Sequence, residues 1–231
     1  MNSLIARLTK SPVAARVAPF IVFVVLTCCQ GVVGETGRYW IYLAKTIVGA
    51  WMLWLVRPVI EEMRWTPSWE SVVVGVAAFI LWIGLDDLLI RIGFASSYPK
   101  LKLSGPPWNP TDPFGSGSAF AWCVILVRFV GSTVIVPPLE EVFFRSFLYR
   151  YLMKVDFLSV PLGTFAWWPF LAASVLFGLE HREWLAGILC GLAYQGLVCQ
   201  KKRLGDAITA HAITNFLLGA WVVWRSAWQY W

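Results

Sequence analysis

The sequence has few charged residues, and this shortage limits the class of protein it can encode. Only 14% of its 231 residues are charged and 58% are hydrophobic, whereas soluble domains have about 25% charged and roughly 45 to 50% apolar residues. The composition predicts an integral membrane protein whose fold class is all-α, a polytopic helix bundle of about seven to eight helices. In such a chain the net charge of +6 is no sign of nucleic-acid binding, and we expect no nucleic-acid partner.

Metal-ligand and disulfide-framework spacings are missing as well. The five cysteines lie in apolar segments, and we interpret them as small buried residues. No internal repeat or low-complexity tract is evident, and nearly every segment is either a span or a short connector. We therefore predict one integral-membrane domain that covers residues 1–231.

Apolar runs predict seven helices and leave one segment open. The runs cover residues 17–33, 39–60, 69–92, 119–136, 165–181, 184–200 and 205–224. Residues 137–164 are interpreted as a re-entrant or interfacial segment, or as an eighth span if residues 138–154 cross fully. No small-x-small cleavage site follows the first run, which favours a retained span over a signal peptide. The distribution of Lys and Arg near the helix ends favours a cytoplasmic N-terminus.

Several charged side chains have structural interpretations. Glu61 and Glu62 lie in a polar turn without a base four residues later, and we predict a solvated connector. Asp87 and Arg91 are spaced as an ion pair at a helix end; the alternative is a role inside the bundle, in which Asp86 or Asp87 receives Arg128. Arg128 lies within an apolar run and must find a carboxylate, a carbonyl or water.

The helix ends carry two further expectations. Lys45 is close enough to one end of its run to reach the membrane surface with its ammonium group. Asp206 stands at the start of the last run and is a candidate N-cap.

Residues 137–152 combine charges with an otherwise apolar segment. Glu140 and Glu141 are adjacent, and Arg145 lies four residues after Glu141, the better order for a helical ion pair. Ionisable side chains at membrane depth are costly and persist where they function or find a partner. The two prolines before the glutamates suit the start or a kink of a helix, which would place both carboxylates in a first turn that favours negative charge. A carboxylate kept ionised can serve as a general base.

Histidine is scarce, because the chain has only His181 and His211. Asn215 lies four residues after His211, on the same face of a helix. Polar groups in a membrane interior must find one another or water, so we expect one wet cavity that gathers Glu140, Glu141, Arg145, His181, His211 and Asn215. A carboxylate and a histidine can deprotonate water, and a second histidine and an asparagine can donate hydrogen bonds to an oxyanion. These are the parts that hydrolysis needs.

Three motifs stand in order on successive apolar helices: Glu-Glu-x-x-x-Arg, Phe-x-x-x-His and His-x-x-x-Asn. Together they resemble the CAAX prenyl endopeptidase and bacteriocin-processing family of intramembrane proteases, also called the ABI family. The resemblance covers residues 137 to about 220, within a predicted catalytic half at 119–224. It implies one role for each residue: water activation by Glu140 with His181, oxyanion stabilisation by His211 with Asn215, and shaping of the site by Glu141 and Arg145.

The chain departs from the family pattern at two positions. Ser146 follows the arginine where glycine is common, and this could alter how closely a neighbouring helix packs. Glu180 precedes His181; it could orient this histidine, but we interpret it as the residue that ends the helix at water.

The resemblance also implies partners and cofactors. Family members are described as glutamate-dependent, so we expect no metal and no cofactor. Their substrates range from prenylated C-terminal motifs to bacteriocin-type peptides, and some members are immunity proteins or scaffolds. We thus expect a CAAX-protease-like intramembrane glutamic endopeptidase, a hydrolase in a bacterial inner membrane, acting on a membrane-associated protein or peptide.

Two alternatives stay open. The same histidines and glutamates could hold zinc in a metal-dependent membrane protease, although their spacing is not that of a His-Glu-x-x-His helix. The cluster could also belong to a non-enzymatic binding or immunity protein, or to a transporter. The substrate and the oligomeric state cannot be read from the sequence.

Overall fold

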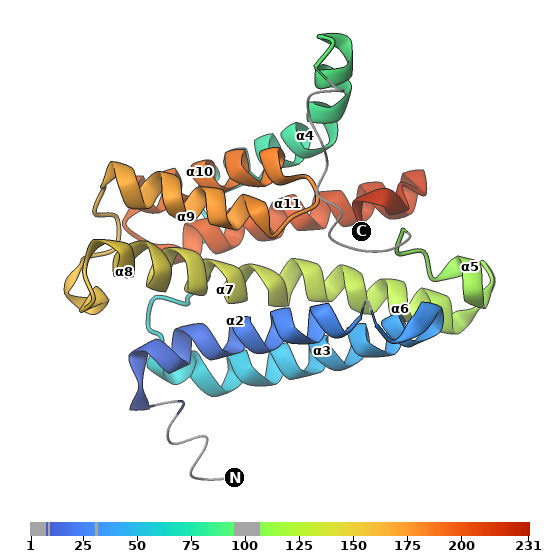
Figure 1. Ribbon diagram of the computed structural model, residues 1–231, viewed down its shortest axis with the longest axis horizontal. Coiled ribbons are helices and arrows are strands. Elements are labelled where there is room, and N and C mark those ends of the chain that lie inside the picture. The colour runs from blue at the N-terminus through green and yellow to red at the C-terminus, as the bar shows by residue number, and fades with distance from the viewer. Residues whose placement is uncertain (1–7, 9, 31, 95–106) are drawn as a thin grey trace. The chain divides into compact units, whose positions relative to one another are not determined.

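The computed structural model describes residues 8, 10–30, 32–94 and 107–231, without the side chains of Asp86, Asp87 and Ile90. The described residues contain helices and no strand (Figure 1), which confirms the all-α fold class. The predicted partnerships of Asp86 and Asp87 lie outside the described side chains. The chain divides into two compact units. The first comprises Met1–Met63, Ser104–Phe143 and Leu218–Trp231, and the second comprises Arg64–Leu103 and Phe144–Leu217.

Four helices of the described chain are long and apolar enough to cross a membrane. They are Pro12–Cys29, Gly34–Val59, Ala119–Met153 and Leu204–Arg225. Shorter apolar helices cover Trp69–Leu85 and Trp167–Leu179. The chain is an integral membrane protein, as its composition predicts.

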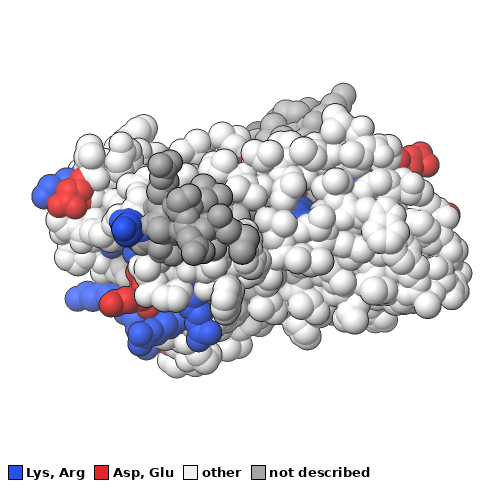
Figure 2. Space-filling view, turned by 90° about the horizontal axis from the view of Figure 1, so that it is seen from below, with Lys and Arg blue, Asp and Glu red and all other residues white. Residues whose placement is uncertain are grey.

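In the first unit, α2 (Pro12–Cys29) and α3 (Gly34–Val56) form an antiparallel hairpin. Ser11 begins α2 by accepting a hydrogen bond from the N–H of Ala14, 3.2 Å away, with Pro12 in the first turn. A short 3₁₀ turn, Arg57–Val59, ends α3. The outer face of α3 exposes Trp40, Ile47, Trp51 and Trp54, and the face in Figure 2 is almost free of charge between its two ends. Such a surface suits lipid.

The central helical run extends without a break from Ala119 to Met153. Its parts are α6 (Ala119–Val130), a π-helical segment (Gly131–Ile135), α7 (Val136–Glu141), a second π-helical segment (Val142–Leu148) and α8 (Tyr149–Met153). The prediction that the prolines begin a helix with the glutamates in its first turn is wrong, because the first turn of α7 contains no acidic residue. The π-helical segment before α7 widens the turn where proline cannot donate its hydrogen bond.

Aromatic rings surround Arg128 in the first unit. The guanidinium carbon lies 4.9 Å from the ring centroid of Tyr42, 4.4 Å from that of Trp108 and 5.3 Å from that of Trp231. The sequence predicted a carboxylate, a carbonyl or water as the partner. Aromatic faces attract a cation through the ring quadrupole. Arg128 of α6 thus contacts α3 through Tyr42, and two segments outside these helices through Trp108 and Trp231.

Lys45 is buried within the same unit, and its ammonium group is enclosed by other side chains. Its side chain is 5% exposed. The ammonium donates a hydrogen bond to Thr27 Oγ1 at 3.0 Å and lies over the rings of Phe23 and Tyr42, at 4.7 and 4.6 Å. The expectation for Lys45 is therefore wrong, since α2 supplies a polar acceptor and an aromatic face at its level.

The second unit contains α4 (Trp69–Arg91), α9 (Trp167–Leu179), α10 (Trp184–Lys201) and most of α11 (Leu204–Arg225). The hairpin of α9 and α10 is tight because small residues face one another. A Cβ on Gly187 would lie 2.8 Å from the Cα of Gly178, and a Cβ on Gly191 would lie 3.0 Å from the carbonyl oxygen of Ser174. This close approach fixes α10 against the C-terminal end of α9, where His181 follows.

Asp206 fastens the start of α11 to the segment before α4. It is fully buried. Its carboxylate accepts hydrogen bonds from Ser68 Oγ at 2.6 Å, Thr66 Oγ1 at 3.2 Å and Arg203 Nε at 2.9 Å. Because α11 begins at Leu204, Asp206 already lies inside the helix. The N-cap prediction is wrong, and the residue joins two chain segments instead.

Candidate active site

The predicted site residues are divided between the two units. Glu140 and Glu141 end α7 in the first unit, with Glu141 fully buried and Glu140 partly buried. The second unit contains Arg145 in the π-helical segment after α7, His181 in the turn after α9, and His211 on α11. Because these residues are divided between the units, the convergence of all six stays a prediction.

Phe177 of α9 gathers three of the second unit's polar residues around one ring. The ring centroid of Phe177 lies 4.9 Å from that of His181 and 5.8 Å from that of His211. The guanidinium carbon of Arg145 lies 4.2 Å from the same centroid. These side chains come from two helical segments and the turn after α9, so the second unit alone brings both histidines and Arg145 together.

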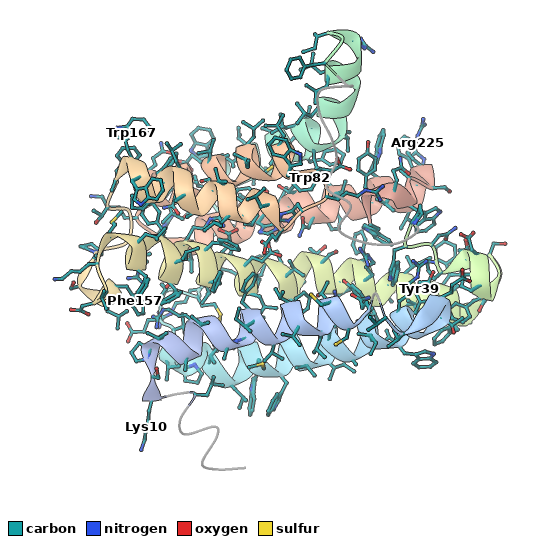
Figure 3. The ribbon with its side chains drawn as sticks, viewed as in Figure 1. Lys10, Tyr39, Trp82, Phe157, Trp167 and Arg225 are labelled. Carbon is teal, nitrogen blue, oxygen red and sulfur yellow. The ribbon has the colours of Figure 1, made fainter. Side chains whose placement is uncertain are left out.

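The backbone fixes the tautomer of His181. Its Nδ1 lies 2.8 Å from the carbonyl oxygen of Phe177. A carbonyl can only accept, so Nδ1 carries the proton and Nε2 of the neutral ring keeps a lone pair. Trp82 of α4, labelled in Figure 3, packs its ring edge-on to the imidazole at 5.3 Å. The ring is thus held on two sides with an acceptor nitrogen available for a proton.

Burial keeps the imidazole of His181, in the turn between α9 and α10, neutral at physiological pH. Burial lowers the pKa of His181 to about 4, and His211 and Arg145 act in the same direction. The hydrogen bond to Phe177 opposes this shift but does not overcome it. A neutral imidazole at physiological pH can accept a proton, whereas a charged one cannot.

His211 is buried against an aromatic ring from α10. The rings of His211 and Tyr194 are stacked with centroids 5.2 Å apart and planes 18° from parallel. The Tyr194 hydroxyl donates to Thr214 Oγ1 at 2.7 Å, and this oxygen lies 3.0 Å from the carbonyl oxygens of both Gly75 and Ala210. Sequence reasoning missed Tyr194 and Thr214. The signals were a tyrosine within an apolar helix and a threonine three residues after His211.

Arg145 is 1% exposed and donates a hydrogen bond to the carbonyl oxygen of Gly191 at 3.4 Å. The predicted ion pair with Glu141 stays a prediction. Ser146, where the family pattern has glycine, is also buried and accepts a hydrogen bond from Arg150 Nη2 at 2.8 Å. The serine therefore binds a neighbouring arginine one turn later in the same helical run.

Two predicted residues have less enclosed positions. Asn215 lies one turn after His211 on α11 and is partly buried. Glu180 is exposed and is the C-cap of α9, which agrees with its interpretation as the residue that ends this helix.

Comparison with known families places this cluster in a matched segment. Residues 120–217 match the family described as type II CAAX prenyl endopeptidase Rce1-like. The match confirms the family resemblance predicted from three motifs, and it contains all six predicted site residues. Searches of curated proteins and of solved structures found no match.

Proposed function

We propose that this chain is an intramembrane endopeptidase that hydrolyses a peptide bond of a membrane-associated protein or peptide. The observation that carries the proposal is the match of residues 120–217 to an Rce1-like family of prenyl endopeptidases. Helices long and apolar enough to span the bilayer support a substrate that is itself associated with the membrane. The site needs no cofactor in this proposal.

Glu140 is the general base of the proposed reaction, and it acts with His181. The carboxylate takes one proton from water, and the resulting hydroxide attacks the carbonyl carbon of the scissile bond. The lone pair on Nε2 of His181 can accept the second hydrogen of that water, which orients it for attack. The proton held by Glu140 then passes to the leaving nitrogen, so the peptide bond breaks without a net change in protons.

His211 and Asn215 stabilise the oxyanion of the tetrahedral intermediate. A ring N–H and an amide N–H₂ both donate hydrogen bonds, and their spacing of one helical turn lets them serve the same oxygen. Glu141 and Arg145 are proposed to shape the site. The burial of Arg145 between the ring of Phe177 and the backbone of Gly191 supports a fixed position for its charge.

We further propose that the protein lies in a bacterial inner membrane with its N-terminus in the cytoplasm. The distribution of basic residues along the chain supports this orientation.

The proposal is tested by comparing protein termini in membranes of cells that carry the wild type, Glu140→Gln or Glu61→Gln at matched abundance. Glu61 is a matched control, because it is the first member of the chain's other pair of adjacent glutamates and is exposed. We expect new termini with the wild type and Glu61→Gln, and none with Glu140→Gln. Identical termini in all three membranes, with any phenotype of the gene intact in Glu140→Gln, would support a binding or immunity protein instead.

A further inference from the structure

We propose that Tyr194 is a positioning residue that holds the imidazole of His211 in the plane required for oxyanion stabilisation. This inference rests on the proposed role of His211. Tyr194 belongs to none of the three motifs, and its ring and its hydroxyl contribute separately.

The ring of Tyr194 limits the rotation of the imidazole. The two rings are nearly parallel, 18° apart, with centroids separated by 5.2 Å. On another side, Phe177 meets His211 almost perpendicularly, at 84° and 5.8 Å. Rotation of the imidazole out of its plane would drive its edge toward the tyrosine ring. A donor that serves a developing charge must be held within about 0.5 Å of its productive position.

The hydroxyl of Tyr194 ties this ring to two other helices. It donates to Thr214 Oγ1 at 2.7 Å, and Thr214 lies on α11 between His211 and Asn215. The Thr214 hydroxyl in turn lies 3.0 Å from two acceptors, the carbonyl oxygen of Gly75 on α4 and that of Ala210 on α11, and can donate to either. Tyr194 and Thr214 are 1% and 2% exposed, so water does not compete for these hydrogen bonds.

The backbones of α4 and α11 are in close contact at this level. A Cβ on Gly75 would lie 2.6 Å from the carbonyl oxygen of Ala210 and 2.8 Å from the Cβ of Ile213. Because α4 cannot move away without losing this packing, the carbonyl of Gly75 is a rigid acceptor. The chain from Tyr194 through Thr214 to Gly75 therefore anchors the ring that stacks on His211.

Histidine-selective NMR of the full chain in lipid nanodiscs tests the stacking of Tyr194 on His211 without any substrate. The chain contains two histidines, so His211→Gln assigns both sets of ring signals. Tyr194→Leu should remove the ring-current shift of the His211 ring protons and leave the His181 signals in place. Tyr194→Phe should keep that shift. Unchanged His211 signals in Tyr194→Leu would overturn the proposal.

Cleavage kinetics test the catalytic consequence with a synthetic peptide that spans a wild-type-dependent cleavage site. Tyr194→Phe should lower kcat about tenfold through the lost hydrogen bond, and Tyr194→Leu about 100-fold through misplacement of the donor, with KM nearly constant. Thr214→Val should act like Tyr194→Phe, and Thr214→Ser should restore the rate. Wild-type kcat in Tyr194→Leu would overturn the proposal.

Tyr149→Phe is the matched control for a lost buried hydroxyl. Tyr149 is 2% exposed, and its hydroxyl donates to the carbonyl oxygen of Thr164 at 2.9 Å in the same unit. We expect wild-type kcat for this variant. An equal loss of kcat in Tyr149→Phe and Tyr194→Phe would show that the loss of a buried hydroxyl acts through general stability, and would contradict the positioning role of Tyr194. A His211→Gln variant that cleaves normally would overturn the proposed role of His211. The NMR signals of the other proteins would still report whether Tyr194 holds the His211 ring.

Discussion

Two pairs of adjacent glutamates lie in the first unit, and their surroundings differ. Glu61 and Glu62 follow the 3₁₀ turn after α3; Glu61 is exposed, and Glu62 binds Arg16. Glu140 and Glu141 lie inside a continuous helical run, where Glu141 is fully buried. A Glu-Glu dipeptide alone therefore says little about function. Its place in a helix and its motif context distinguish a candidate site from a structural contact.

Glu62, the second glutamate of the first pair, forms a structural ion pair with Arg16, so the prediction of a solvated connector is wrong. Glu62 Oε1 accepts hydrogen bonds from Arg16 Nε at 2.9 Å and from Nη2 at 2.7 Å. The side chains of Arg16 and Glu62 are only 5% and 13% exposed. Because α2 and α3 are antiparallel, the start of α2 lies beside the end of α3, a proximity that sequence spacing does not reveal.

Among the variants that would sharpen this comparison, the largest effect on cleavage is expected at His181, the proposed partner of Glu140. His181→Gln should lower cleavage by about 100-fold or more, since it replaces the basic ring nitrogen that assists water activation with a far less basic amide oxygen. The measurement is the yield of wild-type-specific termini from membranes with equal amounts of folded protein. Normal cleavage in His181→Gln would separate Glu140 from this histidine and contradict the proposed pair.

A smaller effect, on stability alone, is expected at Glu62. Glu62→Gln leaves the buried guanidinium of Arg16 without its charged acceptor, so we expect a loss of about 2 kcal/mol in unfolding free energy. Glu61→Gln, at an exposed position, should change it by less than about 0.5 kcal/mol. Reversible unfolding in detergent micelles measures both, and cleavage per folded molecule should be normal in each. Equal losses in the two variants would remove the distinction between these neighbours.

The smallest effect is expected from removal of metal ions. If the second pair acts as a carboxylate base, purified protein treated with a strong chelator should cleave at the untreated rate and contain no stoichiometric metal. Loss of activity that returns with added zinc would favour the metal-dependent alternative, in which the same histidines and glutamates are ligands.

Much of the fold follows from apolar length. The runs that predicted helices at residues 69–92, 184–200 and 205–224 correspond to α4, α10 and α11 within a few residues. The continuous helix from Ala119 to Met153 could not be predicted, because two consecutive prolines usually mark a helix start. The π-helical segment Gly131–Ile135, just before α7, covers the residues with which these prolines cannot form helical hydrogen bonds, and the helix continues through them.

The candidate site was predicted in part for a similar reason. Motif spacing singled out both histidines, and the second unit places them around Phe177. The stacking of Tyr194 on His211 depends on the packing of α10 against α11, which spacing along one helix cannot show. The aromatic partners of Arg128 were missed because two of them, Trp108 and Trp231, lie on opposite sides of the whole matched segment.

The most direct test of the central claim is the rate of peptide cleavage by purified Glu140→Gln, measured beside Glu61→Gln in nanodiscs. Both proteins should show the wild-type unfolding temperature, so that a difference in rate reports chemistry. The account predicts a loss of at least about 100-fold for Glu140→Gln and a rate within about twofold of wild type for Glu61→Gln, since substitutions at exposed positions have small effects. A folded Glu140→Gln protein that cleaves at the wild-type rate would contradict the assignment of Glu140 as the general base.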